Sequence, residues 1–202
     1  MSFNISQKRI TKDIKLLNEN KDILAERGIF FFIDEANIMT MKILIIAKHK
    51  QDISEPTLVS PYVGGMFLFI FDFTQDYPMS PPNVTFNPKQ SFCRLHPNYY
   101  ENGKVCLSVL NTWSTPDWCA TMSILSLITV CEERLNEQSI CFEPSHENEC
   151  INNKIKFNDC VQFAVHHIAI SNVLENKYKE YSVFKDVITP VFKNNGTPII
   201  LR

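Results

Sequence analysis

The stretch MFLFIFDF at residues 66–73 decides the fold of this chain. Phenylalanine occupies every second position of the stretch, and the positions between hold Met, Leu, Ile and Asp. Successive side chains of a β-strand point to opposite faces of the sheet, so both faces of this segment are mostly apolar. A strand of that kind is typical of the centre of a sheet that is covered on both sides. We therefore predict a buried central strand here.

Three further β-rich runs surround this strand in the sequence. They are Ile29–Asp34, Met39–His49 and a shorter run around Val84–Phe86. The connections between the runs are short enough for neighbouring strands to run antiparallel. The pattern therefore predicts a four-stranded antiparallel meander.

A proline-rich loop separates the third run from the fourth. Pro78 and the pair Pro81-Pro82 lie there, and proline is excluded from the interior of a helix or of a central strand. These residues predict a rigid loop, with Met79 at its tip.

The other regular patterns are helical. Residues 5–19 carry apolar side chains at helical spacing on one face and basic side chains on much of the rest. Apolar residues recur in a similar way in Met122–Arg134 and Phe157–Leu174, and Gly28 ends the first helical region. Because the helices come before and after the strands instead of alternating with them, the predicted fold class is α+β.

The length of the chain predicts one domain with a tail. Its 202 residues can bury one core but are too few for two ordinary domains. We assign residues 1–175 to the core domain and residues 176–202 to a C-terminal extension packed on or next to it. Within that extension, the apolar run Val187–Phe192 is broken by Pro190.

The charge and the hydropathy of the chain exclude several partner classes. The formal net charge is −2, whereas a non-specific binder of nucleic acid or of an anionic membrane needs a strong basic excess. The chain opens with no basic and apolar leader, and no apolar run reaches the length of a membrane span. We therefore expect neither nucleic acid nor membrane as a partner, and a location in the cytosol or the nucleus.

The seven cysteines do not predict a metal site. None is paired in a Cys-x-x-Cys spacing, which structural zinc sites usually show. The nearest approach to a ligand set is Cys141, His146 and Cys150, which we do not assign as ligands. Buried free thiols in a reducing compartment are the expected state of most of these cysteines.

One cysteine lies in a segment that predicts reactivity. The sequence HPNYYENGKVCLSVLNTWSTPDW, residues 96–118, places Asn98 eight positions before Cys106, with the turn-forming pair Asn102-Gly103 between them. A tight turn that brings an amide side chain back over a thiol suits acyl transfer through a thioester. The sulfur holds the acyl group, and the amide stabilises the charge that develops as an amine attacks.

The same segment resembles the active-site signature of ubiquitin-conjugating enzymes: an HPN tripeptide, a short turn with Gly, and a Cys followed by Leu. Upstream, SPYVGGMFLFIF at residues 60–71 and YPMSPPNVTF at residues 77–86 are similar to the family's runs in the same order. The resemblance spans roughly residues 5–175. It implies the family's fold, with an N-terminal helix, a four-stranded antiparallel meander, an active-site loop and C-terminal helices.

The two tryptophans point to a subtype within that family. Trp113 and Trp118 lie seven and twelve positions after the cysteine, which is similar to the large class Z members. The resemblance implies a transferase that accepts ubiquitin or a ubiquitin-like protein from an activating enzyme as a thioester. It then passes the modifier to lysine amines of protein substrates, usually with a ligase. No metal or organic cofactor is implied.

The resemblance also implies roles for single residues. Cys106 is the catalytic nucleophile, Asn98 orders the loop and stabilises the oxyanion, and Glu137 best fits the place of the carboxylate that guards the approach of the amine. His96 and Pro97 are implied to support the active-site structure. Trp118 is expected to pack the loop against the core.

Two partner surfaces follow from the resemblance as well. The basic face of the first helix docks the activating enzyme in the family, which implies Lys8, Arg9 and Lys12 here. An exposed apolar residue of the proline-rich loop contacts the ligase, which implies Met79. The family continues this ligase surface with Ser-Pro-Ala after the tryptophan, whereas this chain has Cys119-Ala120-Thr121, so Cys119 and Ala120 form a departure from the family's pattern.

Alternatives remain for the main residues. Asn98 could bond only to the local backbone in an Asx-type turn or be a solvated loop residue. His96 could be the general base of a cysteine hydrolase, although its neighbour Pro97 locks the backbone and the resemblance favours a structural role. The chain as a whole could be a non-catalytic adapter that binds ubiquitin without carrying it, but such relatives lack the cysteine.

Overall fold

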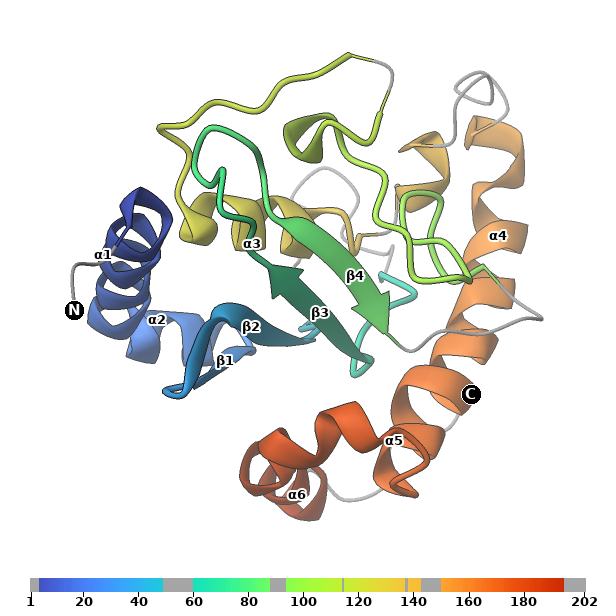
Figure 1. Cartoon of the computed structure of the whole chain (residues 1–202). Coiled ribbons are helices and arrows are strands. Elements are labelled where there is room, and N and C mark those ends of the chain that lie inside the picture. Colours follow the sequence, from blue (N-terminus) through green and yellow to red (C-terminus); the bar gives the residue numbers. More distant parts are fainter. Residues whose placement is uncertain are drawn as a thin grey trace.

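A four-stranded antiparallel sheet lies at the centre of the chain, with strand order β1-β2-β3-β4. The computed structural model describes residues 4–48, 60–87, 94–113, 115–136, 138–142 and 150–194. The predicted meander is confirmed (Figure 1). Its strands are β1 (Ile29–Asp34), β2 (Asn37–Ile46), β3 (Met66–Asp72) and β4 (Asn83–Asn87).

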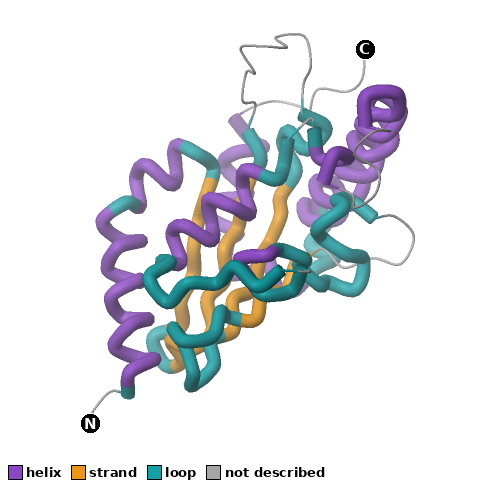
Figure 2. The backbone as a smooth tube through the Cα atoms, turned by 90° about the horizontal axis from the view of Figure 1, so that it is seen from above, coloured by secondary structure: helices purple, strands orange, loops and turns teal. Residues whose placement is uncertain are grey.

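The pairing register places the aromatic side of β3 against the core. Phe69 pairs with Ile43 of β2 and with Phe86 of β4, and all three side chains are almost fully buried. Helix α3 (Ile124–Glu133) packs on this inner face, and its apolar residues join the same core cluster. Figure 2 shows the four strands side by side as one layer.

The first helix begins with a capping box and is followed by a short second helix. Helix α1 (Ile5–Glu19) has Asn4 as its N-cap, whose side chain accepts a hydrogen bond of 2.8 Å from the backbone N–H of Gln7. The short helix α2 (Lys21–Glu26) leads to Gly28. Gly28 has φ +85°, and a Cβ there would lie 2.3 Å from the carbonyl oxygen of Ile46. Glycine is therefore required where the chain turns into β1.

The C-terminal helices differ from the expected ones in two respects. Helix α4 (Cys150–Val165) begins earlier than the predicted start at residue 157 and continues through a π-helical turn (His166–Ser171) to α5 (Asn172–Leu174). The predicted break at Pro190 is wrong, because Pro190 lies inside α6 (Lys185–Asn194). Proline removes one backbone hydrogen bond of the helix, but tertiary packing of an apolar face, here with Ile188 buried, supplies most of a helix's stability.

The segment after residue 175 packs on the outer face of the sheet. A 3₁₀-helix (Lys179–Phe184) and α6 bury the side chains of Tyr181, Phe184 and Ile188. These side chains form a second apolar cluster with residues of β2 and β3: Leu44, Ile46, Met66 and Leu68. The predicted cover on both faces of β3 is confirmed, whereas the exact boundary of the extension stays a prediction.

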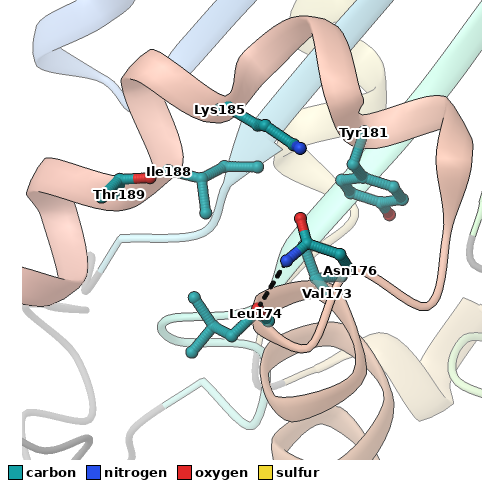
Figure 3. A pocket seen from close by; sticks show the side chains of 7 residues that line it. All are labelled: Val173, Leu174, Asn176, Tyr181, Lys185, Ile188 and Thr189. Carbon is teal, nitrogen blue, oxygen red and sulfur yellow. Dashed lines mark hydrogen bonds between the residues drawn. The ribbon is translucent and has the colours of Figure 1, made fainter.

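A small hollow remains where this segment returns to the sheet. Figure 3 shows Tyr181, Lys185 and Asn176 around it. The hydroxyl of Tyr181 lies 3.0 Å from the carbonyl oxygen of Met66 and 3.1 Å from that of Asn87. Burial raises the pKa of Tyr181 well above its usual value, so the hydroxyl keeps the proton with which it anchors the segment to β3 and β4.

Two features are absent from the described residues. No helix among them is both long and apolar enough to cross a bilayer. No group of three or more His, Cys, Asp or Glu side chains in the same ranges is arranged to hold a metal ion.

Candidate active site

Cys106 lies on the second arm of a tight hairpin whose first arm carries Asn98. The N–H of Cys106 donates a hydrogen bond of 2.8 Å to the carbonyl oxygen of Asn98, and the N–H of Tyr100 donates one of 2.9 Å to that of Lys104. The arms meet at the predicted turn, where Gly103 has φ +91°. The N–H of Phe86 in β4 donates to the carbonyl oxygen of Gly103 over 2.8 Å, so the sheet holds the hairpin.

The amide group of Asn98 bonds to the backbone of the cysteine. Its Nδ2 donates to the carbonyl oxygen of Cys106 over 3.0 Å, and the residue is 2 % exposed. Its Oδ1 is buried and has no hydrogen-bond partner among the described residues. Of the three alternatives for Asn98, a solvated loop residue is therefore wrong. The contact fixes both arms of the hairpin at the position of the nucleophile.

His96 is fully buried and uses both ring nitrogens in structural contacts. Nδ1 accepts a hydrogen bond of 2.9 Å from the N–H of Asn98, and Nε2 lies 2.8 Å from the carbonyl oxygen of Arg134. Because carbonyl oxygens only accept, this network assigns the proton to Nε2. Burial lowers the pKa of His96 from 6.5 to about 3. A neutral ring with both nitrogens engaged has no free site for the thiol proton, which argues against a Cys–His hydrolase.

The sulfur of Cys106 contacts a residue that the sequence patterns did not single out. Sγ lies 3.2 Å from the carbonyl oxygen of Thr112, and Cys106 is 7 % exposed. The Thr112 hydroxyl bonds to the backbone on both sides of the cysteine. The available signal was a threonine shortly after the cysteine in a loop, since threonine hydroxyls often bond to nearby backbone.

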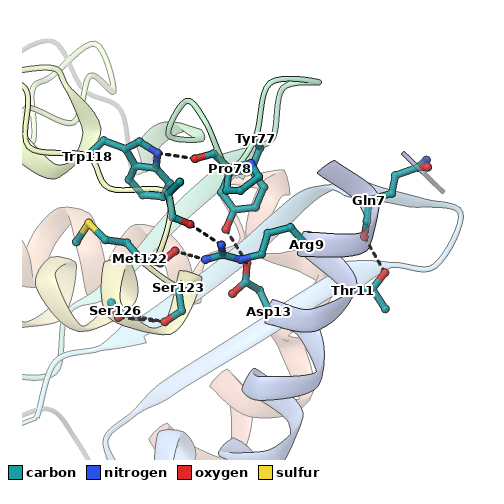
Figure 4. Close-up of polar contacts among 11 residues, drawn as sticks. Gln7, Arg9, Thr11, Asp13, Tyr77, Pro78, Trp118, Met122, Ser123 and Ser126 are labelled. Carbon is teal, nitrogen blue, oxygen red and sulfur yellow. Dashed lines mark hydrogen bonds and ion pairs between the residues drawn. The ribbon is translucent and has the colours of Figure 1, made fainter. Parts of the chain in front are cut away.

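Trp118 joins the loop after the cysteine to the proline-rich loop. Its indole Nε1 donates a hydrogen bond of 2.8 Å to the carbonyl oxygen of Pro78 (Figure 4). Asn111, which has φ +55°, accepts hydrogen bonds of 3.1 Å from the N–H groups of Asp117 and Trp118 through its side chain. The structure thus brings Met79 and the segment of Cys119 and Ala120 to the same region.

Two residues of the predicted ligase surface are exposed and one is partly buried. Met79 is 72 % exposed, and Cys119 is an exposed free thiol. A hydrogen bond with the Thr121 hydroxyl, 3.0 Å from Sγ, lowers the pKa of the Cys119 thiol. Ala120 is half-buried, and its carbonyl oxygen accepts a hydrogen bond from Arg9.

The predicted docking face of α1 separates into two kinds of residue. Lys8 and Lys12 are exposed, whereas the side chain of Arg9 is only 18 % exposed. Figure 4 shows its guanidinium reaching from α1 toward Asp13 and Met122. Nε lies 3.0 Å from Oδ2 of Asp13, and the other two nitrogens donate to the carbonyl oxygens of Ala120 and Met122. Arg9 is therefore held inside the molecule, unlike the two lysines.

The other residues of interest are Glu137, Pro97 and the remaining cysteines. Glu137 lies outside the described residues. Pro97 accepts a hydrogen bond from the guanidinium of Arg94 through its carbonyl oxygen. Among the cysteines, Cys106 and Cys131 are buried free thiols, whereas Cys160, like Cys119, is exposed. Cys141 is disulfide-bonded and is an exception to the free thiols expected for most of the cysteines.

Comparison with known proteins gives a consistent result. The family model described as ubiquitin-conjugating enzyme matches residues 9–165. Ubiquitin-conjugating enzyme E2 Z of Xenopus tropicalis is 34 % identical over 135 residues, which are 66 % of this chain and 43 % of that protein. The protein of the same name from Danio rerio is 38 % identical over 120 residues, which are 58 % of this chain and 37 % of that protein.

A third relative is much longer. The human dual E2 ubiquitin-conjugating enzyme/E3 ubiquitin-protein ligase BIRC6 is 32 % identical over 142 residues, which are 64 % of this chain and 3 % of that protein. The matched part of this chain therefore spans less than half the length of each of these relatives. The family match extends over more than half of this chain and includes the hairpin that carries Asn98 and Cys106. The chain belongs to the ubiquitin-conjugating enzyme family.

Proposed function

We propose that this chain carries ubiquitin or a ubiquitin-like protein as a thioester on Cys106 and transfers it to lysine amines of protein substrates. The observation that carries the proposal is the hairpin in which the Asn98 amide binds the backbone of Cys106 over 3.0 Å. This hairpin holds a free thiol on a rigid scaffold, as covalent catalysis through a thioester requires.

The first chemical step is an exchange of thioesters. Sγ of Cys106 attacks the carbonyl carbon of the modifier's C-terminus, which the activating enzyme holds on its own thiol. A new C–S bond forms on Cys106, the old C–S bond breaks, and the proton lost from Cys106 is balanced by protonation of the departing thiol. The activating enzyme, which spends the ATP, therefore supplies all the energy stored in the thioester.

The second step is attack by an amine. A neutral lysine amine adds to the thioester carbonyl, the C–S bond breaks, and the nitrogen loses a proton while the sulfur leaves as the thiol. Free lysine has a pKa of about 10.4, so its amine is mostly protonated at neutral pH. Desolvation on approach favours the neutral form. His96 does not serve as the base, because it is buried and both of its ring nitrogens are hydrogen-bonded.

We assign two docking surfaces within this proposal. The exposed Lys8 and Lys12 of α1 receive the activating enzyme, without Arg9, whose guanidinium is engaged inside the molecule. Met79 and Cys119 receive the ligase. The hydrogen bond from Trp118 to Pro78 joins the two segments on which they lie. We also propose the cytosol or the nucleus as the place of the reaction, because Cys106 is a free thiol and reducing compartments keep thiols free. The disulfide of Cys141 is the feature of the described residues that does not follow from such a compartment.

A charging reaction tests the proposed function. The chain is incubated with an activating enzyme, ATP and ubiquitin or a ubiquitin-like protein, and the products are separated on a non-reducing gel. We expect an adduct that reductant removes, that disappears in Cys106→Ala and that becomes resistant to reductant in Cys106→Lys. Cys160→Ala is the matched control, because it removes a different free cysteine that is exposed, and it should leave the adduct in place.

Two results of the charging reaction would contradict the proposal. A folded wild-type chain that forms no adduct with any of several activating enzymes and modifiers is not a carrier. An adduct that persists in Cys106→Ala would place the thioester on another cysteine and would overturn the assignment of the site.

A further inference from the structure

Thr112 contacts Cys106 and both of its neighbours in the sequence, Val105 and Leu107. Its carbonyl oxygen lies 3.2 Å from Sγ of Cys106. Its hydroxyl oxygen accepts a hydrogen bond of 2.9 Å from the N–H of Leu107 and lies 2.8 Å from the carbonyl oxygen of Val105. Its own N–H donates to the carbonyl oxygen of Leu107 over 3.2 Å. One residue thus engages the nucleophile and the backbone on both sides of it.

The chemistry of a threonine hydroxyl fits this position. A hydroxyl has one proton to donate and two lone pairs to accept with. The N–H of Leu107 uses one lone pair, and the proton is shared between the carbonyl oxygens of Val105 at 2.8 Å and Leu107 at 3.1 Å. Valine has the same shape but no hydroxyl, so it would leave the Leu107 N–H without this partner. Serine keeps the hydroxyl and loses only the methyl group.

The local backbone explains why Thr112 returns to the cysteine. After Leu107 the chain makes a 3₁₀ turn (Ser108–Leu110), and Asn111 follows with φ +55°. A left-handed residue of this kind reverses the chain direction. The side chain of Asn111 bonds forward to the N–H groups of Asp117 and Trp118, while Thr112 bonds back to Val105 and Leu107. The loop that begins at the cysteine is therefore closed by Thr112.

We propose that Thr112 is a positioning residue that closes this loop and fixes the place of Cys106 for transfer. The inference rests on the proposed function, because it concerns the carrier cysteine. Thr112 does not exchange protons or bonds with the substrate. It acts through the backbone of residues 105–107, and misplacement of a reacting group by about 1 Å can reduce a rate by about 100-fold.

The contacts of Thr112 divide into one that charging must break and others that it can leave intact. A thioester sulfur carries no proton, so the contact from Sγ to the Thr112 carbonyl ends when the modifier is loaded. The Thr112 hydroxyl bonds only to backbone groups of Val105 and Leu107, and loading of the sulfur leaves these groups unchanged. These contacts can therefore remain in the charged state. Loading then frees the sulfur from the Thr112 carbonyl oxygen, while the backbone of Cys106 stays in place.

Discharge of the thioester is the first test. The wild-type chain, Thr112→Val and Thr112→Ser are charged with ubiquitin, and loss of the adduct is followed over a range of free lysine concentrations. We expect Thr112→Val to lower the maximal discharge rate by about tenfold or more, with little change in the lysine concentration that gives half the maximal rate. Thr112→Ser should restore most of the rate. Thr40→Val, which removes a hydroxyl bonded to Asp72 on the sheet, is the matched control and should discharge like wild type.

Thiol reactivity is the second test, and it needs no modifier. The uncharged chains are treated with iodoacetamide, and alkylation of each cysteine is followed by peptide mass spectrometry. We expect Cys106 to react about fivefold faster in Thr112→Val than in wild type, because an opened loop exposes a residue that is 7 % exposed in the closed one. Thr112→Ser and Thr40→Val should react at the wild-type rate.

Two other cysteines distinguish local opening from unfolding. Cys131 is a free thiol in the core, 1 % exposed, and burial raises its pKa to about 12, so it reacts only when the core opens. Cys119 is an exposed free thiol that reports the activity of the reagent. We expect the rates of both to be unchanged in Thr112→Val. Faster alkylation of Cys131 together with Cys106 would mean general loss of the fold and would overturn the proposal.

The tests also separate this inference from the proposed function. If the wild-type chain forms no adduct, the proposed function fails, and the alkylation rates still decide whether Thr112 holds Cys106. If the adduct forms, and Thr112→Val discharges and alkylates within twofold of wild type, Thr112 is not a positioning residue although the function stands.

Discussion

The guanidinium of Arg9 donates a hydrogen bond of 2.5 Å to the carbonyl oxygen of Ala120, a residue 111 positions away in the chain. The same side chain pairs with Asp13, which is 3 % exposed, and donates to the carbonyl oxygen of Met122. Asp13 also accepts a hydrogen bond of 2.6 Å from the hydroxyl of Tyr77. Arg9 thus joins α1 to the loop of Ala120, and through Asp13 it is joined to the residue before Pro78.

Replacement of Arg9 should destabilise the fold, unlike replacement of its basic neighbours. Arg9→Ala leaves the buried carboxylate of Asp13 without its guanidinium and frees two carbonyl oxygens. We expect the free energy of unfolding to fall by about 1.5–3 kcal/mol, as for hydrogen bonds to charged groups. Lys8→Ala, at an exposed position of the same helix, should change it by less than about 0.5 kcal/mol. Urea unfolding of both variants measures the difference.

Arg9→Ala and a double variant of the two lysines should differ in the opposite sense in the rate of thioester loading. Lys8→Ala, combined with Lys12→Ala, should slow charging by the activating enzyme, because these exposed cations are the proposed docking groups. Arg9→Ala, assayed at a temperature where it stays folded, should charge at a rate nearer to wild type. A larger charging defect in Arg9→Ala than in the lysine pair would show that the guanidinium leaves its internal partners to dock.

Asn98 should affect both loading and discharge of the thioester. Its amide holds the Cys106 carbonyl oxygen at 3.0 Å, so Asn98→Ala loosens the hairpin before any oxyanion forms. We expect slower charging as well as slower discharge, with the discharge defect at least as large. Removal of an oxyanion donor alone costs about 10²–10³-fold in rate. Single-turnover measurement of both steps decides whether Asn98 orders the hairpin, stabilises the oxyanion or does both. Normal charging with defective discharge would leave only the oxyanion role.

The sequence predicted the sheet better than the contacts around Cys106, and the reason is physical. The alternation of apolar residues in β3 is a local pattern, and its register with Ile43 and Phe86 follows from which faces must be buried. The bond from Arg9 to Ala120 joins distant parts of the chain, so no local pattern contains it. The helix through Pro190 likewise depends on packing against the sheet. Such contacts exist only once the whole fold is assembled.

The site was predictable to the extent that its residues are neighbours in sequence. Asn98 and Cys106 face each other because a single turn at Gly103 returns the chain. Thr112 was not singled out, because a threonine after a loop cysteine indicates only that its hydroxyl can bond nearby backbone. The residue types do not show which backbone groups it reaches. Arg9 was assigned to the surface for a similar reason, since two of its three hydrogen-bond partners are carbonyl oxygens.

The C-terminal segment should stabilise the sheet through its buried aromatic residues. Phe184 is 3 % exposed and packs in the cluster with Leu44 and Met66 on the outer face. Truncation of a buried phenylalanine typically costs about 3–5 kcal/mol, and we expect Phe184→Ala to lie in that range. Val183→Ala is the matched control, since Val183 is 37 % exposed, and it should cost far less. Equal losses in urea unfolding would contradict the packing of this segment.

Acid should destabilise the fold through His96, and the direction follows from its pKa. Burial lowers the pKa of His96 to about 3 in the folded chain from 6.5 in the unfolded one. Between these values the unfolded state binds more protons, so the free energy of unfolding falls as the pH falls below 6.5. The limiting slope is about 1.4 kcal/mol per pH unit. Above pH 6.5 this contribution is complete and constant.

Two measurements check the titration of His96. Urea unfolding from pH 7.5 to pH 4.5 should show a smaller slope in His96→Gln than in wild type, and His167→Gln, at an exposed position, should keep the wild-type slope. Because His96→Gln also loses the contacts to Asn98 and Arg134, the second measurement uses the unmutated chain. Nuclear magnetic resonance of its imidazole nitrogens should show His96 neutral, with the proton on Nε2, down to about pH 4. A His96 that titrates near pH 6.5 in the folded chain would make it available as a base and would reopen the hydrolase alternative.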